Sequence, residues 1–484
     1  MAPHLSPAKH SGPQSFLEAP NNCNELWWRD PGLRTLNFWL AVLFLSPFMV
    51  GFDGSLIGGL LATPQWLKGG LIGFLPTSYL MDKFGRRRSL FWEISWSLVQ
   101  LQGKRFVPHG HHTLLAVGIV ICLCAVPVLI TELARPRQRG TVGSLFGSFF
   151  FLGAIVSAWT NFGTLHILSS WSWRIPTLMQ ILPAVIQASL IVFVPESPRW
   201  LVKMGRNAEA KNFFVTYHAN GIEDGELALL EYTEVCQMIH GEASEQTAGW
   251  LDYIRTGPNR KRLFITLMVA LFAQCSGNGI VSYYFVLVLQ SAGINGGLQI
   301  FNWLMVILAS LFVDKVGRRK LFLGSSVAML VTLIAVAICN ERFLATGNIS
   351  AGYCMIPFPF LFNGAYDFTY SPLPTLYTAE IHPFDLRAKG VSISFASAFG
   401  FGLFNQYVNQ IALEAITWKY YLVFIAIVAC QLPIIYFIFP KTKGLTVVEV
   451  RYLFEGGSTD SVLQDLRSKD RKQSMESLHV AENA

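Results

Sequence analysis

Apolar runs of membrane-spanning length recur along most of this chain, and no other feature restricts its fold as strongly. Crossing a hydrocarbon layer takes roughly 20 helical residues, because every backbone amide must find its hydrogen-bond partner inside the segment. The clear runs lie near residues 36–61, 113–131, 142–165, 174–194, 263–289, 294–313, 320–339, 352–378, 390–414 and 417–439. Two weaker runs lie at about 70–81 and 89–102. The ten clear and two weak runs predict an all-α membrane protein with twelve transmembrane helices.

The composition supports this class and excludes several others. Of 484 residues, 52% are hydrophobic and 14% are charged, whereas a soluble domain carries about 25% charged residues. The formal charge of +7 fits basic loops beside a lipid bilayer better than nucleic-acid binding. Most of the cysteines lie inside apolar runs and no CxxC pair occurs, so we expect neither a disulfide framework nor a metal site. No nucleophile–base constellation is visible, which predicts that the chain is not an enzyme and has no cofactor.

Basic segments follow the spans in a pattern that predicts topology. In a twelve-helix arrangement they fall on one side, which the positive-inside rule makes cytoplasmic, together with both termini. The predicted organisation is an N-terminal tail (1–35), a first transmembrane bundle (36–195), a linker with short cytoplasmic helices (196–262), a second bundle (263–440) and a C-terminal tail (441–484).

An internal repeat divides the chain into two related halves. The string DKFGRRR at 82–88 matches DKVGRRK at 314–320, and each string ends a span. Glu132 and Arg139 are seven residues apart, as are Glu380 and Arg387. Two six-helix halves follow from this correspondence.

Seven strings in a fixed order carry a family resemblance. They are GFDGS at 51–55, DKFGRRR at 82–88, ITELA at 130–134, PESPRW at 195–200, QCSG at 274–277, DKVGRR at 314–319 and YTAE at 377–380. With these strings the chain resembles the sugar porter family of the major facilitator superfamily, in its fungal lactose permease-like and hexose transporter branch. The resemblance implies two six-helix bundles that alternate access to a central sugar site, with a mono- or disaccharide as substrate and a proton as the coupled ion.

The resemblance also implies a cytoplasmic gate built from the repeated charges. A carboxylate at one helix end can pair with guanidinium groups or with the N-terminus of a neighbouring helix, and so hold the cytoplasmic side closed. The alternative is that these charges only orient the protein in the bilayer. The implied gate residues are Asp82, Arg86, Arg87, Glu132, Arg139, Glu196, Arg199, Asp314, Arg318, Arg319, Glu380 and Arg387.

Amides at membrane depth are the candidate sugar ligands, because sugar hydroxyls need partners that both donate and accept. Gln274 and Asn278 share one face of the seventh span, and Asn405 and Asn409 share one face of the eleventh. For each amide the alternative is a helix–helix hydrogen bond. The full set of candidate substrate residues is Gln274, Asn278, Tyr283, Tyr284, Asn302, Asp367, Asn405 and Asn409.

Proton coupling is expected at an intramembrane carboxylate. Asp53 and Asp367 lie inside spans, where a charged acid is costly and marks a functional candidate. In proton-coupled relatives the position of Asp53 carries the proton and an Arg on the fourth helix tunes it, but here His112 occupies that place. The alternative for Asp53 is a local hydrogen bond.

Several positions depart from the family pattern. Ala273, Gly147 and Thr375 replace residues that hexose porters use for sugar contact, and Lys441 replaces an acid. Only 28 residues separate Asp53 from Asp82, which predicts a truncated second helix and an altered third. The sequence therefore leaves three alternatives to a proton-coupled symporter: a facilitated carrier, a non-transporting sugar sensor and an inactive paralogue. We expect a monomer in the plasma membrane.

Overall fold

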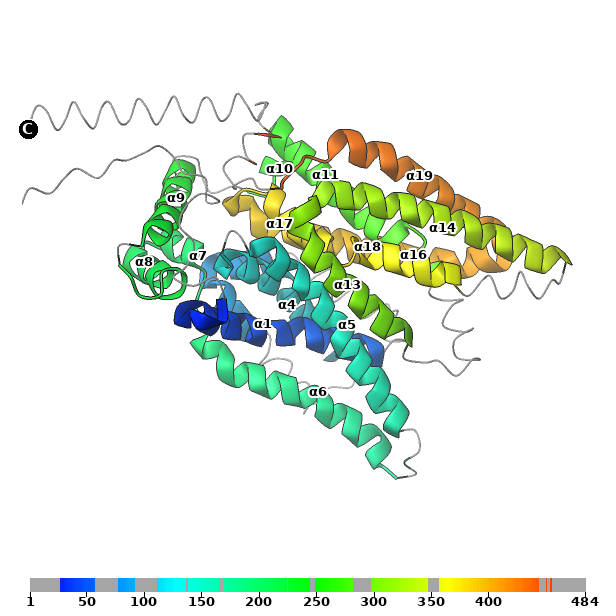
Figure 1. The fold of residues 1–484 in the computed structure, drawn as a ribbon, viewed down its shortest axis with the longest axis horizontal. Coiled ribbons are helices and arrows are strands. Elements are labelled where there is room, and N and C mark those ends of the chain that lie inside the picture. Colours follow the sequence, from blue (N-terminus) through cyan, green and yellow to red (C-terminus); the bar gives the residue numbers. More distant parts are fainter. Residues whose placement is uncertain are drawn as a thin grey trace, which may run out of the picture.

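The computed structural model describes residues 27–56, 77–91, 111–135, 138–164, 167, 169–223, 225–243, 249–281, 297–346, 357–443, 450 and 453–454. Within these ranges every regular element is helical, which confirms the predicted all-α class (Figure 1). Seven of the described helices are long and apolar enough to cross a membrane. An eighth, α4 (His111–Leu133), contains a shorter apolar stretch at Gly118–Leu133.

One group of helices comprises α1 (Pro31–Leu56), α4, α5 (Arg139–Thr164) and α6 (Trp171–Leu190). Helices α1 and α5 pack with their backbones in contact, because glycines occupy both sides of the crossing. A Cβ atom on Gly51 would lie 1.9 Å from the carbonyl oxygen of Phe150, and one on Gly153 would lie 2.0 Å from that of Phe48. Side chains are thus excluded from the crossing by geometry.

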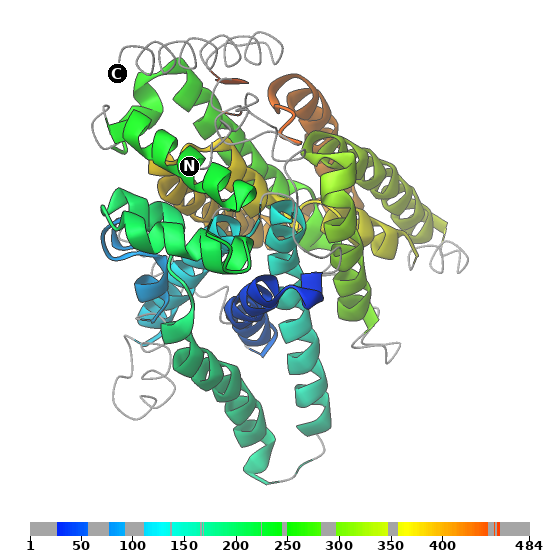
Figure 2. The same cartoon turned by 60° about the vertical axis from the view of Figure 1, so that its left-hand side comes forward.

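A second group comprises α11 (Gly257–Cys275), α13 (Gly297–Val316), α14 (Arg318–Thr346), α16 (Pro357–Asp367), α17 (Leu373–Ile381), α18 (Phe384–Ile416) and α19 (Tyr420–Ile438). It lies beside the first group in both views (Figures 1 and 2). Two of its predicted spans are interrupted. The helix containing α11 breaks at Gly277, whose φ of 94° is left-handed, and α16 is separated from α17 by a turn that ends in Pro372.

Short helices fill the predicted linker and gather at one end of the bundle, which we call the linker end (Figure 1). They are α7 (Pro198–Lys203), α8 (Asn207–Phe213), the π-helix η4 (Phe214–His218), α9 (Glu226–Ala243) and α10 (Asp252–Arg255). In the structure, the segment predicted to be a linker thus contains several short helices.

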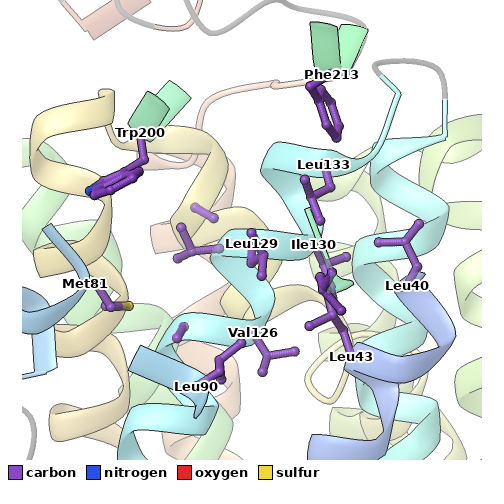
Figure 3. Close-up of a cluster of buried hydrophobic side chains, with 14 of the residues drawn as sticks. Leu40, Leu43, Met81, Leu90, Val126, Leu129, Ile130, Leu133, Trp200 and Phe213 are labelled. Carbon is purple, nitrogen blue, oxygen red and sulfur yellow. The ribbon is translucent and has the colours of Figure 1, made fainter. Parts of the chain in front are cut away.

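The linker helices are fixed to the first group by a shared hydrophobic core and by one buried histidine. Figure 3 shows Leu40 of α1, Leu133 of α4 and Phe213 of α8 in the same cluster of buried side chains. The ring of His218 lies between the carbonyl oxygen of Leu133, 3.2 Å from Nε2, and the carboxylate of Glu231. The linker therefore packs against the end of α4.

The region predicted to contain a shortened second helix is described only in part. Residues 77–84 and 86–91 are helical on either side of Gly85. The predictions of a truncated second helix and an altered third helix fall mainly on residues 57–76 and 92–110, which lie outside the described residues.

Candidate functional site

The two DK-x-GRR strings adopt the same local structure. Gly85 and Gly317 have φ values of 91° and 93°, so each glycine ends one helix and allows the next to start in a new direction. The carboxylate of Glu196 then accepts from the backbone N–H groups of Arg86 and Arg87, at 3.0 and 3.1 Å. Burial raises the pKa of Glu196, and these hydrogen bonds and the nearby guanidinium groups oppose that shift. Glu196 thus caps the helix that follows Gly85.

Glu132 lies at the centre of the charge cluster at the linker end. Its side chain is fully buried and pairs with Arg86, with Nε 3.3 Å from Oε2. The second oxygen lies 3.8 Å from Nη1 of Arg387, which belongs to the other helix group. The repeat analysis grouped Arg387 with Glu380, but the structure places Arg387 on Glu132. One buried carboxylate therefore holds guanidinium groups from both halves.

At the same end, α18 makes two further contacts, one with the first half and one with the linker. Lys389 of α18 lies 3.9 Å from the carboxylate of Asp82, and Lys203 of the linker pairs with Asp385 of α18 at 2.7 Å. Burial raises the pKa of Asp82, while Arg86, Lys203 and Lys389 lower it. Neither lysine belongs to the repeated strings, so the sequence analysis did not select them. Their positions close to the motifs were the only indication in the sequence.

The charges of the second half also reach the first. Arg318 pairs with Asp314 at 2.9 Å and with Glu380 at 2.6 Å. The backbone N–H and the hydroxyl of Thr141, at the start of α5, both donate to Asp314 at 3.0 Å. This approach requires Gly140, since a Cβ there would lie 1.9 Å from the Asp314 carboxylate. The linker end is therefore closed by contacts between the two helix groups.

Three predicted gate residues have other neighbours. Nε of Arg139 and Nη1 of Arg199 are buried without a hydrogen-bond partner among the described residues. Arg139 lies within electrostatic range of Glu231 and Glu380. Arg319 donates to the carbonyl oxygen of Tyr436 and stacks on its ring at 5.1 Å.

The substitution of Lys441 makes the two halves unequal. By the repeat, Lys441 corresponds to Glu196, so the second half has a cation in its sequence where the first half has a capping carboxylate. Thr442 instead donates to Glu380 at 3.0 Å, and Lys443 donates to the carbonyl oxygen of Lys315 at 2.5 Å. The C-terminal end of α19 is thus held by a hydroxyl and an ammonium group.

Four of the candidate amides come together around the break in α11. The side chain of Asn405 donates to the backbone carbonyl of Gln274 at 2.7 Å, and a Cβ on Gly402 would lie 3.3 Å from Oε1 of Gln274. Asn278 bonds to Tyr366, and Asn409 accepts from Tyr420 at 2.8 Å. Asn405 and Asn409 thus make the helix–helix hydrogen bonds that were the alternative interpretation, while the Gln274 amide group stands half-buried beside them.

Other candidates lie apart from this cluster. Asn302 belongs to α13, and its Oδ1 is buried with no hydrogen-bond partner in the described part of the chain. Tyr283 and Tyr284 lie outside the described residues, and His112 lies in α4 but its side chain is not described. Asp367, at the end of α16, accepts from Ser371 at 2.6 Å.

Asp53 has a partner that the sequence analysis did not consider. Its carboxylate bonds to the side chain of Gln180 on α6, and Oδ1 is buried without a partner among the described residues. A neutral amide therefore contacts the carboxylate on the side of α6. An amide inside an apolar run was the signal, and the reasoning applied to Gln274 would have found it.

Comparisons with known proteins agree with this architecture. The symporter XylE bound to 6-bromo-6-deoxy-D-glucose, described as a proton:xylose symporter, superposes with a TM-score of 0.74 at 20% identity over 87% of this chain and 99% of that one. The inward-open conformation of XylE from E. coli gives a TM-score of 0.63 at 19% identity, over 86% of this chain and 99% of that one. The fold is that of the major facilitator superfamily.

Sequence comparisons narrow the class further. The model of the family described as "Sugar (and other) transporter" matches residues 65–454. High-affinity glucose transporter 1 of Candida albicans is 26% identical over 473 residues, covering 88% of this chain and 87% of that protein. The galactose transporter of Saccharomyces cerevisiae is 27% identical over 356 residues, covering 71% and 62%. The chain belongs to the sugar (and other) transporter family, which comprises transporters and not enzymes.

Proposed function

We propose that this protein carries a mono- or disaccharide across a membrane by alternating access, in symport with a proton. Family membership supports the transport of a sugar, since the matched relatives include glucose and galactose transporters. The observation that carries the proposal is the amide cluster at the break in α11. A half-buried amide at membrane depth offers a donor and an acceptor to sugar hydroxyls. Gln274 is the first sugar contact in this proposal, with Asn278 beside it at the break in α11 and Asn302 as a separate candidate on α13.

The linker end serves as the cytoplasmic gate in this proposal. Its support is the set of contacts that join the two helix groups there, through Glu132, Asp82 and Asp314. The excess of Lys and Arg at this end favours a cytoplasmic orientation, with both termini on that side, bundles at 36–195 and 263–440, and the linker at 196–262. A monomer in the plasma membrane completes the proposal.

Asp53 is the proposed proton carrier. An acid in a transmembrane helix is a functional candidate because it can change its charge as access changes. The partner on α6, Gln180, is neutral, so it can bond to either protonation state and does not hold the acid ionised as a guanidinium group would.

Uptake of radiolabelled sugars in a cell that lacks its own sugar transporters tests this proposal. We expect concentrative uptake that an uncoupler abolishes and that Asp53→Asn reduces to equilibration. Uptake insensitive to both would establish facilitated diffusion instead. Binding and signalling without flux would indicate a sensor, and failure to reach the membrane would indicate an inactive paralogue.

A further inference from the structure

Asp367 is a buried acid, and only one of its two carboxylate oxygens has a hydrogen-bond partner among the described residues. It is the last residue of α16, beside the turn that separates α16 from α17, and only 3% of its surface is exposed. The hydroxyl of Ser371 donates to Oδ1 at 2.6 Å. The other oxygen, Oδ2, is buried and has no hydrogen-bond partner among the described residues.

Among the residues that the structure describes, no cation acts on the carboxylate of Asp367. Its titratable neighbours are Tyr366 and Tyr370, whose hydroxyls are engaged with the carbonyl of Ala273 and with Ser326. The other elements contact the residues on either side of Asp367, through Gly147 of α5, the Phe312 ring of α13, and the Ser325 hydroxyl and Leu321 carbonyl of α14. These groups are neutral.

An ionised carboxylate does not fit this environment. Burying a charge without a counter-ion is strongly unfavourable, and here one oxygen also lacks a donor among the described residues. A protonated carboxyl group places its hydrogen on Oδ2 and removes the charge. The surroundings of Asp367 therefore favour the neutral acid over the ionised one.

The acid also lies at the boundary between the two helix groups. Helix α5 of the first group packs directly on the turn, since a Cβ on Gly147 would lie 3.3 Å from the carbonyl oxygen of Ser371 and 3.5 Å from Cα of Pro372. Ser371 is the residue whose hydroxyl holds Asp367. Movement of α5 away from this turn would admit water to the pair.

We propose that Asp367 is a proton-binding site, occupied while the linker end is closed and emptied when the helix groups separate there. On separation the Oδ2–H bond breaks, its electron pair stays on the carboxylate and the proton passes to water. The place of this step in a transport cycle rests on the proposed function. The site differs from Asp53, which lies in the other helix group and bonds to α6.

The test measures conformation rather than transport. Spin labels on Lys83→Cys and Lys441→Cys, two exposed positions in different halves at the linker end, report the distance between the halves by pulsed electron paramagnetic resonance in a background without native cysteines. In the unsubstituted protein we expect the ratio of separated to closed forms to rise with pH, by about tenfold per pH unit for each proton released. Asp367→Asn is neutral at every pH. In this variant the ratio should therefore rise less steeply with pH, by the contribution of one proton.

Asp53→Asn is the matched control, and it should retain the part of the pH dependence that Asp367 contributes. A slope in Asp367→Asn equal to that of the unsubstituted protein would overturn the proposal. If Asp367→Asn does not purify as a monodisperse protein, Ser371→Ala provides the test. It removes the hydroxyl that donates to Asp367 at 2.6 Å and should move the midpoint of the pH response. An unmoved midpoint would overturn the proposed site. A pH-dependent separation in a protein that moves no sugar would contradict the proposed function alone.

Discussion

His382 follows the last residue of α17 and is almost completely buried. Its Nδ1 lies 2.8 Å from the carbonyl of Thr378, and Tyr253 packs on its ring edge to face at 5.6 Å. Burial, together with the nearby guanidinium groups of Arg262 and Arg387, lowers the pKa of His382 from 6.5 to about 3, although the hydrogen bond to Thr378 opposes the shift. The folded protein therefore contains the neutral imidazole.

The sign of the resulting pH dependence is definite. Because the pKa of His382 is lower in the folded state, its contribution to stability is fully present above 6.5 and is lost as the pH falls toward about 3. A single such group can lower the free energy of unfolding by up to about 1.4 kcal/mol per pH unit. We therefore expect the unfolding temperature in detergent to fall less steeply over this interval in His382→Gln. Thermal unfolding with an intrinsic fluorescence readout measures it. Identical pH profiles for both proteins would contradict this account of the buried ring.

Residue-level reasoning from the sequence succeeded where one side chain carries its own signal. Gln274 and Asp53 were identifiable because polar groups in apolar runs are costly. Their partners were not: Asn405 reaches the backbone of Gln274, and Gln180 reaches Asp53, through contacts between helices far apart in sequence. Only the packing of α11 on α18 and of α1 on α6 determines these pairs.

At the level of elements, helix breaks organise the molecule. The left-handed glycines Gly85 and Gly317 follow from the repeated string and were predictable as a pair. The close crossing of α1 and α5 was not, because no local pattern distinguishes a glycine that touches a neighbouring backbone from one that faces open space.

Two glycines of α5 test this distinction. Gly153→Ala should impair folding, because its Cβ would lie 2.0 Å from the carbonyl oxygen of Phe48. Gly163→Ala is the matched control, since nothing lies within 4 Å of the added atom, and removing a helical glycine favours the helix by about 0.5–1 kcal/mol. The yield of monodisperse protein and its unfolding temperature measure both. Equal losses in the two variants would show that the crossing is not close.

At the level of the whole molecule, the charges at the linker end interlock the halves. The sequence predicted the participants from the repeat, but it grouped them within each half. In the structure one of these ion pairs joins the two halves, because the ends of α4 and α18 meet and bring Arg387 to Glu132. Which cation meets which carboxylate depends on how the two groups are packed, and a repeat within one chain contains no information about that packing.

Glu132→Gln should release this end. Removing one member of a buried ion pair costs about 3–5 kcal/mol because its partners stay buried and charged, and here both Arg86 and Arg387 lose their carboxylate. We expect the labelled linker end to shift toward the separated form by at least about a hundredfold. Glu209→Gln is the control, since its pair with Arg206 is exposed; an equal response to both substitutions would contradict the gate.

Sugar counterflow in liposomes containing the purified protein tests the central claim most directly. Vesicles preloaded with unlabelled sugar are diluted into a trace of labelled sugar, for a panel of hexoses, pentoses and disaccharides. The account predicts a transient accumulation of label with at least one of them, and a half-saturating concentration raised about tenfold by Gln274→Ala, which removes one buried hydrogen-bonding group. No accumulation with any sugar, from monodisperse protein whose linker end opens and closes, would contradict it.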